Sequence, residues 1–389
     1  MRVAIDLFVA EKEPGGMLFA TRALLDGLAQ LQPEHEYVII TSRPKEYQEL
    51  TAAPNIRIHA VRLRSWRGIL IQHQLLLPEI LHRIRPDVLH VPTFAAPIGW
   101  HGPLVMTVHD LAFLKMPQQS SLYARLYWQY MLRESVRRSQ RIMVVSEQTR
   151  EELIAHWSID PDRIAIVHNA LRSSLRYNED LTSESQVMRR RYGGRYLLHV
   201  GRIMPRKNVE TLVDAFQELA PRFPDLNLVL TGGAGHASSE VLKRIEESPY
   251  TSRIHLAGWV PEQELGPLYA GASALVFPSK HEGFGLPTVE AMACGAPVVA
   301  SPEAASQEIA GDAVLRVDCS HSSFLAQGIE QVLTDEALRT RLLTLGKIQA
   351  QPFTSKACAQ VTSQIYYQAA HMEKAVEHTG VLGQSIVRP

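Results

Sequence analysis

The sequence predicts an α/β protein made of two parallel-sheet domains in tandem. The chain has 389 residues, more than one ordinary hydrophobic core accommodates. Short apolar runs alternate with segments of helical periodicity, and continuous apolar strands are typical of parallel sheets covered by helices on both faces. The alternation is lost across residues 171–194 and then restarts. That stretch therefore contains the expected junction between two Rossmann-like domains, residues 1–178 and 179–354.

The first domain is expected to open with a strand at 3–9, a turn at Glu13-Pro14-Gly15-Gly16 and a helix at 19–29. Helical spacing of apolar residues predicts further helices at 75–84 and 122–138. Ser146 is a suitable cap for a helix that runs through Leu153 and His156. The other expected strands are residues 37–40, 56–63, 86–91, 104–110, 142–146 and 163–169.

The second domain repeats this alternation. Its expected strands are residues 196–200, 226–231, 254–257, 274–277, 296–300 and 313–317. Its expected helices are residues 208–220, 322–334 and 336–349, and Asn208 is expected to cap the first of them. The two domains thus have the same architecture without any short-period sequence repeat.

Composition argues against several classes of protein. Apolar residues make up 46% and charged residues 21% of the chain, as in ordinary globular proteins. Lysine plus arginine balances aspartate plus glutamate at 40 each, so net charge gives no support for a nucleic-acid partner. The three cysteines lack metal-site spacing and suit a reducing compartment. Because no apolar run approaches the ~18 residues of a membrane span, and the apolar N-terminus reads as a strand, we expect a cytoplasmic protein.

The segment 277–295 is the most informative part of the sequence. It reads strand, glycine loop, short helix and strand, with Pro287 expected at the first helical position and Gly295 just past the helix end. Gly283 and Gly285 precede the helix N-terminus, where free N–H groups and the helix dipole favour an anion. Two carboxylates, Glu282 and Glu290, flank this terminus. A phosphate site whose carboxylates bind sugar or ribose hydroxyls is one interpretation, and an ordinary loop with two solvated glutamates is the other.

Other candidate residues follow the expected strands, at the edge where open parallel sheets bind ligands. Arg202 and Lys207 lie in a loop after the strand 196–200, and both side chains can hold phosphate, although a solvated basic loop would look the same. His109 and Asp110 end the strand 104–110. Gly15-Gly16 follows the first strand but is not a full dinucleotide-binding motif, so an NAD-dependent enzyme is disfavoured.

Two further patterns are weaker. Asp160-Pro161-Asp162 resembles a metal-binding D-x-D motif, but a surface turn before the strand 163–169 is the better interpretation. No His/Cys cluster has metal-ligand spacing, so we expect no catalytic metal. The stretch 56–85 holds six arginines against Glu79 alone, with Trp66 and Ile69–Ile71 between them. It could contact an anionic membrane, and a solvated basic face is the alternative.

Together these motifs resemble the retaining glycosyltransferases of family GT4 (group 1), which have the GT-B fold, and in particular mannosyltransferases among them. The resemblance covers nearly the whole chain and rests on five motifs in order. They are the N-terminal Gly15-Gly16, Val-His-Asp-Leu at 108–111, Val-Ser-Glu-Gln-Thr-Arg at 145–150, Gly-Arg-x4-Lys-Asn at 201–208, and Glu282-x7-Glu290. The resemblance implies two Rossmann-like domains facing a deep cleft, with a C-terminal helix, about 355–389, crossing back to the N-terminal acceptor domain.

The resemblance also implies a role for each matched residue. Arg202 and Lys207 would hold the donor diphosphate, Glu282 the sugar hydroxyls and Glu290 the ribose hydroxyls. Gly16 would let the first domain approach the phosphate, and His109 would contact the transferred sugar. Donor contacts from the segment 283–286 and from the loop at 258–260 would be mainly through backbone groups, at Gly283, Phe284, Gly285, Leu286 and Val260. Two departures from the family pattern are Met17-Leu18-Phe19 after the glycine pair and Ser355 in place of a tryptophan.

The expected function is transfer of a hexose from a nucleotide-diphosphate sugar to a hydroxyl of a glycan or lipid-linked acceptor, without a cofactor or metal. The His-Asp-Leu variant resembles that of family members that use GDP-mannose, often for surface polysaccharides or glycolipids, and this resemblance favours GDP-mannose while UDP-sugars and other GDP-sugars remain open. A sugar-nucleotide epimerase or hydrolase of the same fold, and a non-enzymatic sugar-nucleotide-binding module, are the alternatives. The sequence does not identify the acceptor or the linkage.

Overall fold

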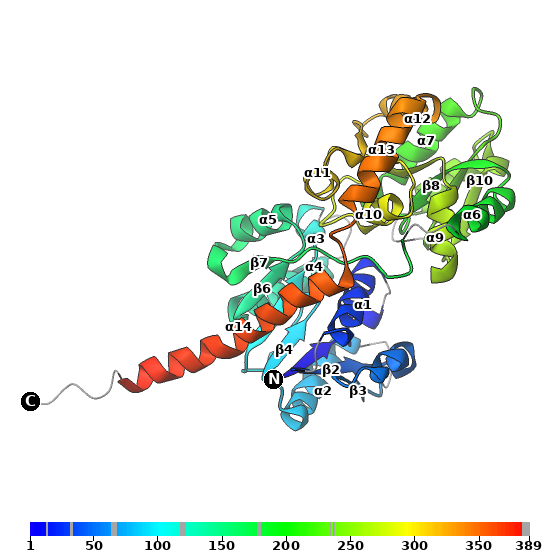
Figure 1. Ribbon diagram of the computed structural model, residues 1–389. Coiled ribbons are helices and arrows are strands. Elements are labelled where there is room, and N and C mark those ends of the chain that lie inside the picture. Colours follow the sequence, from blue (N-terminus) through cyan, green and yellow to red (C-terminus); the bar gives the residue numbers. More distant parts are fainter. Residues whose placement is uncertain are drawn as a thin grey trace, which may run out of the picture. The chain divides into compact units, whose positions relative to one another are not determined.

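The structure of the protein is a computed structural model that describes residues 1–12, 15–31, 34–63, 68–116, 122–176, 180–233, 235 and 238–382 (Figure 1). The chain forms two compact units. Unit 1 comprises Met1–Leu114, Ser121–Arg172 and Phe353–Pro389, and unit 2 consists chiefly of Ser173–Pro352. The chain thus leaves unit 1 after Arg172 and returns at Phe353. The boundaries expected from the sequence were a few residues later, after residues 178 and 354. The expected Glu13-Pro14 turn, Arg64, Trp66 and Arg67 lie outside the described residues.

Unit 1 is built on a seven-stranded parallel sheet with the order β3-β2-β1-β4-β5-β6-β7. Residues on β4 and β5 are all buried, as expected for central strands covered on both faces. The strands are β1 (Arg2–Asp6), β2 (Glu36–Thr41), β3 (Ile56–Ala60), β4 (Val88–Val91), β5 (Leu104–Val108), β6 (Arg141–Val144) and β7 (Ile164–Ile166). The helices are α1 (Gly16–Ala29), α2 (Ile69–Ile84), α3 (Ala112–Lys115), α4 (Leu122–Arg138), α5 (Glu147–Trp157) and α14 (Ser355–Leu382).

Helix α14 returns from unit 2 and packs against α1, which confirms the expected C-terminal crossing (Figure 1). Gly27 of α1 allows this approach, because a Cβ there would lie 2.0 Å from the Ser355 carbonyl oxygen. Further along α14, the Tyr366 hydroxyl lies 2.7 Å from His90 Nδ1 on β4. His90 Nε2 in turn lies 2.9 Å from the Thr107 hydroxyl on β5. The backbone of Ser355 thus lies directly against a glycine of α1.

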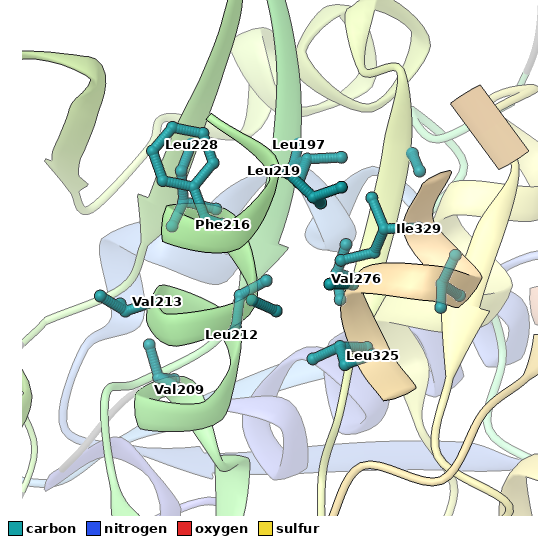
Figure 2. Close-up of a cluster of buried hydrophobic side chains, with 14 of the residues drawn as sticks. Leu197, Val209, Leu212, Val213, Phe216, Leu219, Leu228, Val276, Leu325 and Ile329 are labelled. Carbon is teal, nitrogen blue, oxygen red and sulfur yellow. The ribbon is translucent and has the colours of Figure 1, made fainter. Parts of the chain in front are cut away.

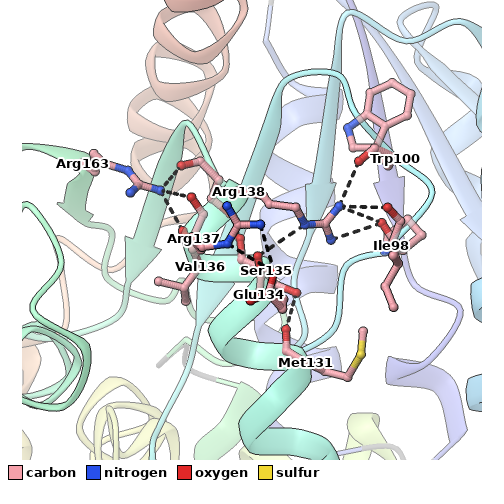
Figure 3. Close-up of polar contacts among 11 residues, drawn as sticks. Ile98, Trp100, Met131, Glu134, Ser135, Val136, Arg137, Arg138 and Arg163 are labelled. Atoms are coloured by element: carbon pink, nitrogen blue, oxygen red, sulfur yellow. Dashed lines mark hydrogen bonds and ion pairs between the residues drawn. The ribbon is translucent and has the colours of Figure 1, made fainter.

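Two arginines satisfy carbonyl groups around the C-terminal end of α4 (Figure 3). Arg138 donates from Nη1 to the carbonyls of Pro97, Ile98 and Trp100 at 3.2, 3.2 and 2.9 Å. Arg163 donates from Nη2 to the carbonyl of Val136 at 2.7 Å. Because the last carbonyls of a helix lack intrahelical donors, these contacts stabilise the helix end and fix the loop before β5.

Unit 2 is built on a six-stranded parallel sheet with the order β10-β9-β8-β11-β12-β13. Its strands are β8 (Arg195–Val200), β9 (Leu226–Thr231), β10 (Ile254–Gly258), β11 (Ala274–Phe277), β12 (Val298–Ala300) and β13 (Leu315–Arg316). Its helices are α6 (Asp180–Arg191), α7 (Val209–Leu219), α8 (Ser239–Glu246), α9 (Glu262–Gly271), α10 (Leu286–Ala293), α11 (Ala304–Ala310), α12 (Ser322–Thr334) and α13 (Glu336–Gln349). Apolar side chains of α7 and α12 cover one face of this sheet over Leu197, Leu228 and Val276 (Figure 2).

Two expectations for unit 2 were wrong in detail. The irregular stretch expected at 171–194 contains the helix α6, which packs on α9 and buries Leu181 and Met188. Asn208 is the N-cap residue of α7 as expected, but its Oδ1 accepts from the Thr211 hydroxyl at 2.9 Å and not from a backbone N–H. It adopts a left-handed conformation (φ 54°), which asparagine tolerates better than most residues, and its Nδ2 donates to the Cys319 carbonyl at 2.8 Å.

The other expected elements are present with shifted ends; α2 begins at Ile69 and not at residue 75, and the helices α3, α8, α9 and α11 were not expected. Ser146 caps α5 as expected, with its Oγ accepting from the Thr149 N–H at 3.2 Å. Pro287 is the second rather than the first residue of α10, and Gly295 follows the helix end with φ 77°. Asp160-Pro161-Asp162 forms the expected exposed turn. Among the helices within the described residues, none has the length and apolar character needed to cross a membrane.

Candidate functional site

The site begins at the carboxyl ends of β8 and β11, which are neighbours in the unit 2 sheet. The loop after β8 carries Arg206 and Lys207, and the loop after β11 carries Glu282. The two loops are joined by a backbone hydrogen bond from the Lys280 N–H to the Arg206 carbonyl, at 2.8 Å. Parallel pairing of the strands thus brings together two segments that are far apart in sequence.

Lys207 and Glu282 form the centre of this site. Lys207 Nζ donates to Glu282 Oε1 at 2.6 Å, and Arg206 Nη1 donates to Glu282 Oε2 at 3.2 Å. Lys207 and Glu282 retain only 8% and 9% exposure, and Nζ also lies 4.8 Å from the centre of the Phe277 ring. Burial by itself would raise the pKa of Glu282, but the two cations outweigh it and lower this pKa to about 2. Glu282 is therefore a carboxylate at neutral pH.

Glu290 lies one turn inside α10 and is also buried. Its Oε2 accepts a hydrogen bond from the Tyr269 hydroxyl of α9 at 2.7 Å. A carboxylate can accept several hydrogen bonds, so this contact orients one oxygen and leaves further acceptor capacity on the group. Hydroxyl groups of a ligand are suitable partners for that capacity.

The glycine loop before α10 contains a left-handed backbone position that glycine adopts without strain. Gly285 precedes the helix with φ 83°, and Gly283, Phe284 and Gly285 are all buried. Leu286 begins the helix and is half-buried. The first turn presents backbone N–H groups and the positive end of the helix dipole, an arrangement that favours an anion. Within the described residues, the buried Thr288 hydroxyl in this turn has no hydrogen-bond partner.

The loops after β8, β9 and β10 are tied to one another. Gly232 donates its N–H to the Gly258 carbonyl at 2.6 Å, and Ile203 donates to the Gly233 carbonyl at 3.2 Å. A Cβ on Gly232 would lie 2.4 Å from the Gly201 carbonyl oxygen, so this position requires glycine. Arg202 follows Gly201 and is half-buried, as is Val260 after β10. Val260 therefore lies two strands from β8, about 10 Å away at the usual strand spacing.

The remaining predicted residues, Gly16 and His109, belong to unit 1. Gly16 is the exposed first residue of α1, and His109 directly follows β5. Burial lowers the pKa of His109 to about 4, against a smaller opposing effect of Asp110. The imidazole is therefore neutral at pH 7, and its buried Nε2 has no hydrogen-bond partner in the described structure. Unit 2 thus brings together Lys207, Glu282, the glycine loop and Glu290. Gly16 and His109 lie at the carboxyl edge of the unit 1 sheet.

Sequence reasoning missed four residues that build the site of unit 2. Arg206 shares Glu282 with Lys207, Tyr269 orients Glu290, Phe277 lies beneath Lys207, and Gly232 packs on the loop after β8. Only Arg206 and Gly232 carried a signal, as neighbours of motif residues. Tyr269 and Phe277 look like ordinary core residues in the sequence. No group of three or more metal-binding side chains occurs in the part of the chain that the structure describes.

Each of the two units matches a model of a known protein family. Residues 182–347 match the family model for glycosyl transferases group 1, and residues 14–174 match the model for Glycosyltransferase Family 4. The chain is 32% identical to an O-antigen chain mannosyltransferase B of Escherichia coli over 72% of this chain and 74% of that protein. It is 27% identical to a D-inositol 3-phosphate glycosyltransferase of Corynebacterium diphtheriae over 76% of this chain and 74% of that protein.

A solved structure agrees with this result. The HepE protein of Anabaena, crystallised in complex with UDP and glucose, superposes with a TM-score of 0.74 at 19% identity, over 94% of this chain and 98% of that chain. This similarity concerns the fold, and the family follows from the sequence matches. The chain belongs to the family 4 (group 1) glycosyltransferases and has their GT-B fold of two Rossmann-like units.

Proposed function

We propose that this glycosyltransferase moves a hexose from a nucleoside-diphosphate sugar to a hydroxyl of a glycan or lipid-linked acceptor, with retention of configuration. The observation that carries this proposal is the buried cluster of Lys207, Arg206 and Glu282 beside the N-terminus of α10. Lys207, together with Arg202 of the same loop and the helix N-terminus, suits a diphosphate, and the ionised Glu282 suits sugar hydroxyls.

The proposed donor site assigns one part of the donor to each group. Arg202 and Lys207 hold the diphosphate, with the N–H groups of 283–286 beside it. Glu282 accepts from sugar hydroxyls. Glu290, oriented by Tyr269, accepts from the ribose, and the backbone at Val260 meets the base. Val260 lies about two strand spacings, ~10 Å, from β8, which suits the reach of a nucleotide from its diphosphate to its base.

The proposed chemistry follows from charge. The bond between the anomeric carbon and the phosphate oxygen breaks, negative charge develops on the nucleoside diphosphate, and the bond to the acceptor oxygen forms on the same face. The departing phosphate oxygen takes the acceptor's proton. Lys207, Arg202 and the helix N-terminus stabilise the developing charge in place of a metal, which makes the reaction metal-independent. His109 and Gly16 contribute from unit 1, His109 as a neutral contact to the transferred sugar.

A covalent intermediate on Glu282 is less favoured. Both carboxylate oxygens of Glu282 are engaged by cations, and its pKa of about 2 makes it a weak nucleophile. The same contacts suit a carboxylate that holds hydroxyl groups in a fixed position.

GDP-mannose is the proposed donor, and surface polysaccharide or glycolipid synthesis the proposed role. The similarity to an Escherichia coli mannosyltransferase of O-antigen chains supports this choice. The structurally similar HepE was crystallised with UDP and glucose, so a UDP-sugar is the alternative donor. We further propose a cytoplasmic location, since the donors expected here are cytoplasmic metabolites.

A membrane contact through 56–85 is a separate proposal. Ile71 and Leu75 of α2 are 67% and 70% exposed and supply an apolar surface. The arginines of this segment contribute less charge than their number indicates, because Arg57 pairs with Glu36 and Arg83 with Glu79. Binding of Ile71→Ser/Leu75→Ser to vesicles containing anionic lipid should fall, while Leu256→Ser in unit 2, 51% exposed, serves as control. Equal binding by all three proteins would contradict this contact.

The function itself is tested by a thermal-shift screen of nucleotide sugars in EDTA. A true donor raises the melting temperature by mass action, and GDP-mannose should give the largest shift. Release of nucleoside diphosphate only in the presence of an acceptor extract would support transfer. Release of free sugar, or of an altered sugar nucleotide, without acceptor would instead identify a hydrolase or epimerase. Binding without any turnover would identify a non-enzymatic module.

A further inference from the structure

His199 is a buried titratable residue of unit 2 to which the proposed function gives no role. It is the second-last residue of β8 and is completely buried. Its Nδ1 lies 3.2 Å from the carbonyl oxygen of Val276 on the neighbouring strand β11. Because a carbonyl can only accept, Nδ1 carries the proton. Its ring also stacks on Phe277, with centroids 6.4 Å apart and an interplanar angle of 21°.

The second ring nitrogen is therefore a bare acceptor. Burial, and to a smaller extent the nearby positive charge of Lys207, lowers the pKa of His199 to about 4. The imidazole is then neutral at pH 7, with a lone pair on Nε2. No described residue donates a hydrogen bond to this atom. A buried acceptor without a donor is costly, which points to a donor that arrives in another state of the site.

His199 and Lys207 face the same small region. A Cβ built on Gly201 would lie 3.8 Å from His199 Nε2 and 3.8 Å from Lys207 Nζ, so both nitrogens border the position that a side chain at residue 201 would occupy. Both side chains also contact Phe277, His199 by stacking and Lys207 with Nζ over the ring. Lys207 can thus approach Nε2 by a change of its flexible side chain alone.

We propose that His199 is a positioning residue, whose Nε2 accepts a hydrogen bond from the Lys207 ammonium when a diphosphate is bound; this inference rests on the proposed function of the site. An ammonium group has three N–H donors. One is directed to Glu282 in the structure, one would reach a phosphate oxygen, and Nε2 accepts the third. With all three directions fixed, the charge of Lys207 is held at the diphosphate.

The neutrality of His199 is essential to this role. A carboxylate in its place would add negative charge beside the diphosphate and weaken anion binding. A neutral imidazole directs the ammonium and leaves its positive charge available to the ligand. His199 acts through Lys207 and does not touch the diphosphate itself.

Two substitutions separate this role from a structural one. His199→Asn retains an N–H group near Nδ1 for the Val276 carbonyl and removes the acceptor at Nε2. His199→Gln places an amide oxygen near Nε2 and gives up the bond to Val276. Isothermal titration calorimetry with GDP and UDP measures affinity, and the thermal midpoint of each variant measures stability.

We expect His199→Asn to weaken nucleoside diphosphate binding by roughly tenfold or more, and His199→Gln to stay within about threefold of the natural protein. The thermal midpoint should fall more in His199→Gln than in His199→Asn. A purely structural histidine would give the reverse order in affinity, which would overturn the inference. If the Asn variant does not fold, retained binding in the Gln variant supports the inference and lost binding overturns it.

The dependence on Lys207 gives a second criterion. In a Lys207→Met background, His199→Asn should cause no further loss of affinity, because the residue acts only through Lys207. An additional loss of the same size in both backgrounds would overturn the inference. If the natural protein binds neither nucleotide, the proposed donor site fails together with this inference. If it binds and the order of variants is reversed, only the role of His199 fails.

Discussion

Lys207 Nζ donates to Glu282 Oε1 at 2.6 Å although 74 residues separate the two side chains in sequence, and both are more than nine-tenths buried. Burying such a pair costs desolvation that a surface pair avoids, and Arg206 adds a second cation to the same carboxylate. A cation and a carboxylate kept charged beside a helix N-terminus are groups that a ligand with phosphate and hydroxyls can use. This pair is therefore the first target for mutation.

Lys207→Met keeps an unbranched apolar side chain and removes the charge that lies over the Phe277 ring. Transfer should fall by about 10² to 10³, since one preorganised donor to a developing charge is lost. The matched control is Lys280→Met, which removes an exposed lysine of the neighbouring loop that pairs with Glu210. Steady-state kinetics with the identified donor measures both. Similar activity in the two variants would contradict a role of Lys207 at the diphosphate.

Tyr269→Phe removes the hydroxyl that orients Glu290. The KM for the donor should rise several-fold, with about 1 kcal/mol lost in stability. Tyr196→Phe is the control, because it removes another buried hydroxyl, which donates to the Leu268 carbonyl at 2.6 Å. Its stability should fall by a similar amount while KM stays constant. An unchanged KM in Tyr269→Phe would argue against ribose binding by Glu290.

Gly232→Ala tests the packing of the loops after β8 and β9. A Cβ at this position would overlap the Gly201 carbonyl, and the backbone φ of 94° is itself unfavourable for alanine. We expect about 1–3 kcal/mol of destabilisation and weaker donor binding, because the loop carrying Arg202 is displaced. Nothing lies within 4 Å of a Cβ on Gly233, so Gly233→Ala should behave like the natural protein in urea unfolding and in calorimetry. Equal effects of the two substitutions would be inconsistent with this packing.

Three buried histidines predict how stability depends on pH. Burial lowers the pKa of His90 to about 3 and those of His109 and His199 to about 4. Between the ordinary value near 6.5 and about pH 4, the unfolded chain binds protons at these groups and the folded chain does not. The contribution of these histidines to the free energy of unfolding should therefore be constant above pH 6.5. Below that pH the free energy of unfolding should fall, by up to about 1.4 kcal/mol per pH unit for each histidine.

Urea unfolding between pH 7 and 4 measures this proton uptake. The histidines lie in different units, so the transition of unit 1 should reflect His90 and His109, and that of unit 2 should reflect His199. His199→Asn should lower the uptake of unit 2 by one proton. A stability that rises from pH 7 to pH 5 would show that these imidazoles are charged in the folded protein.

The alternation of strands and helices could be predicted from the sequence, because apolar runs and helical spacing of apolar residues depend on neighbouring residues in the chain. The helix α6 was missed, since it ends in Arg189-Arg190-Arg191 and has little apolar pattern; only its packing on α9 makes it part of the core. The side-chain contacts of Asn208 could not be predicted for a related reason. Asn208 is the N-cap of α7 and a left-handed residue, and its Nδ2 donates to the carbonyl of Cys319, which is distant in sequence.

The sequence predicted which residues belong to the candidate site but not which of their side chains contact one another. Motif spacing identified Lys207, Glu282 and Glu290 at strand and helix ends. It could not indicate that Lys207 contacts Glu282 directly, because that contact depends on the pairing of β8 with β11. Tyr269 and His199 lie within apolar sequence, and their functions depend on which atoms face them across the sheet and from α9.

The most direct test of the proposed function is proton NMR of the reaction, followed in EDTA with the donor that gives the largest thermal shift and with an acceptor. We predict a glycoside with the anomeric configuration of the donor, formed together with an equal amount of nucleoside diphosphate. A product with inverted configuration, or free sugar in place of a glycoside, would contradict retaining, metal-independent transfer by this site.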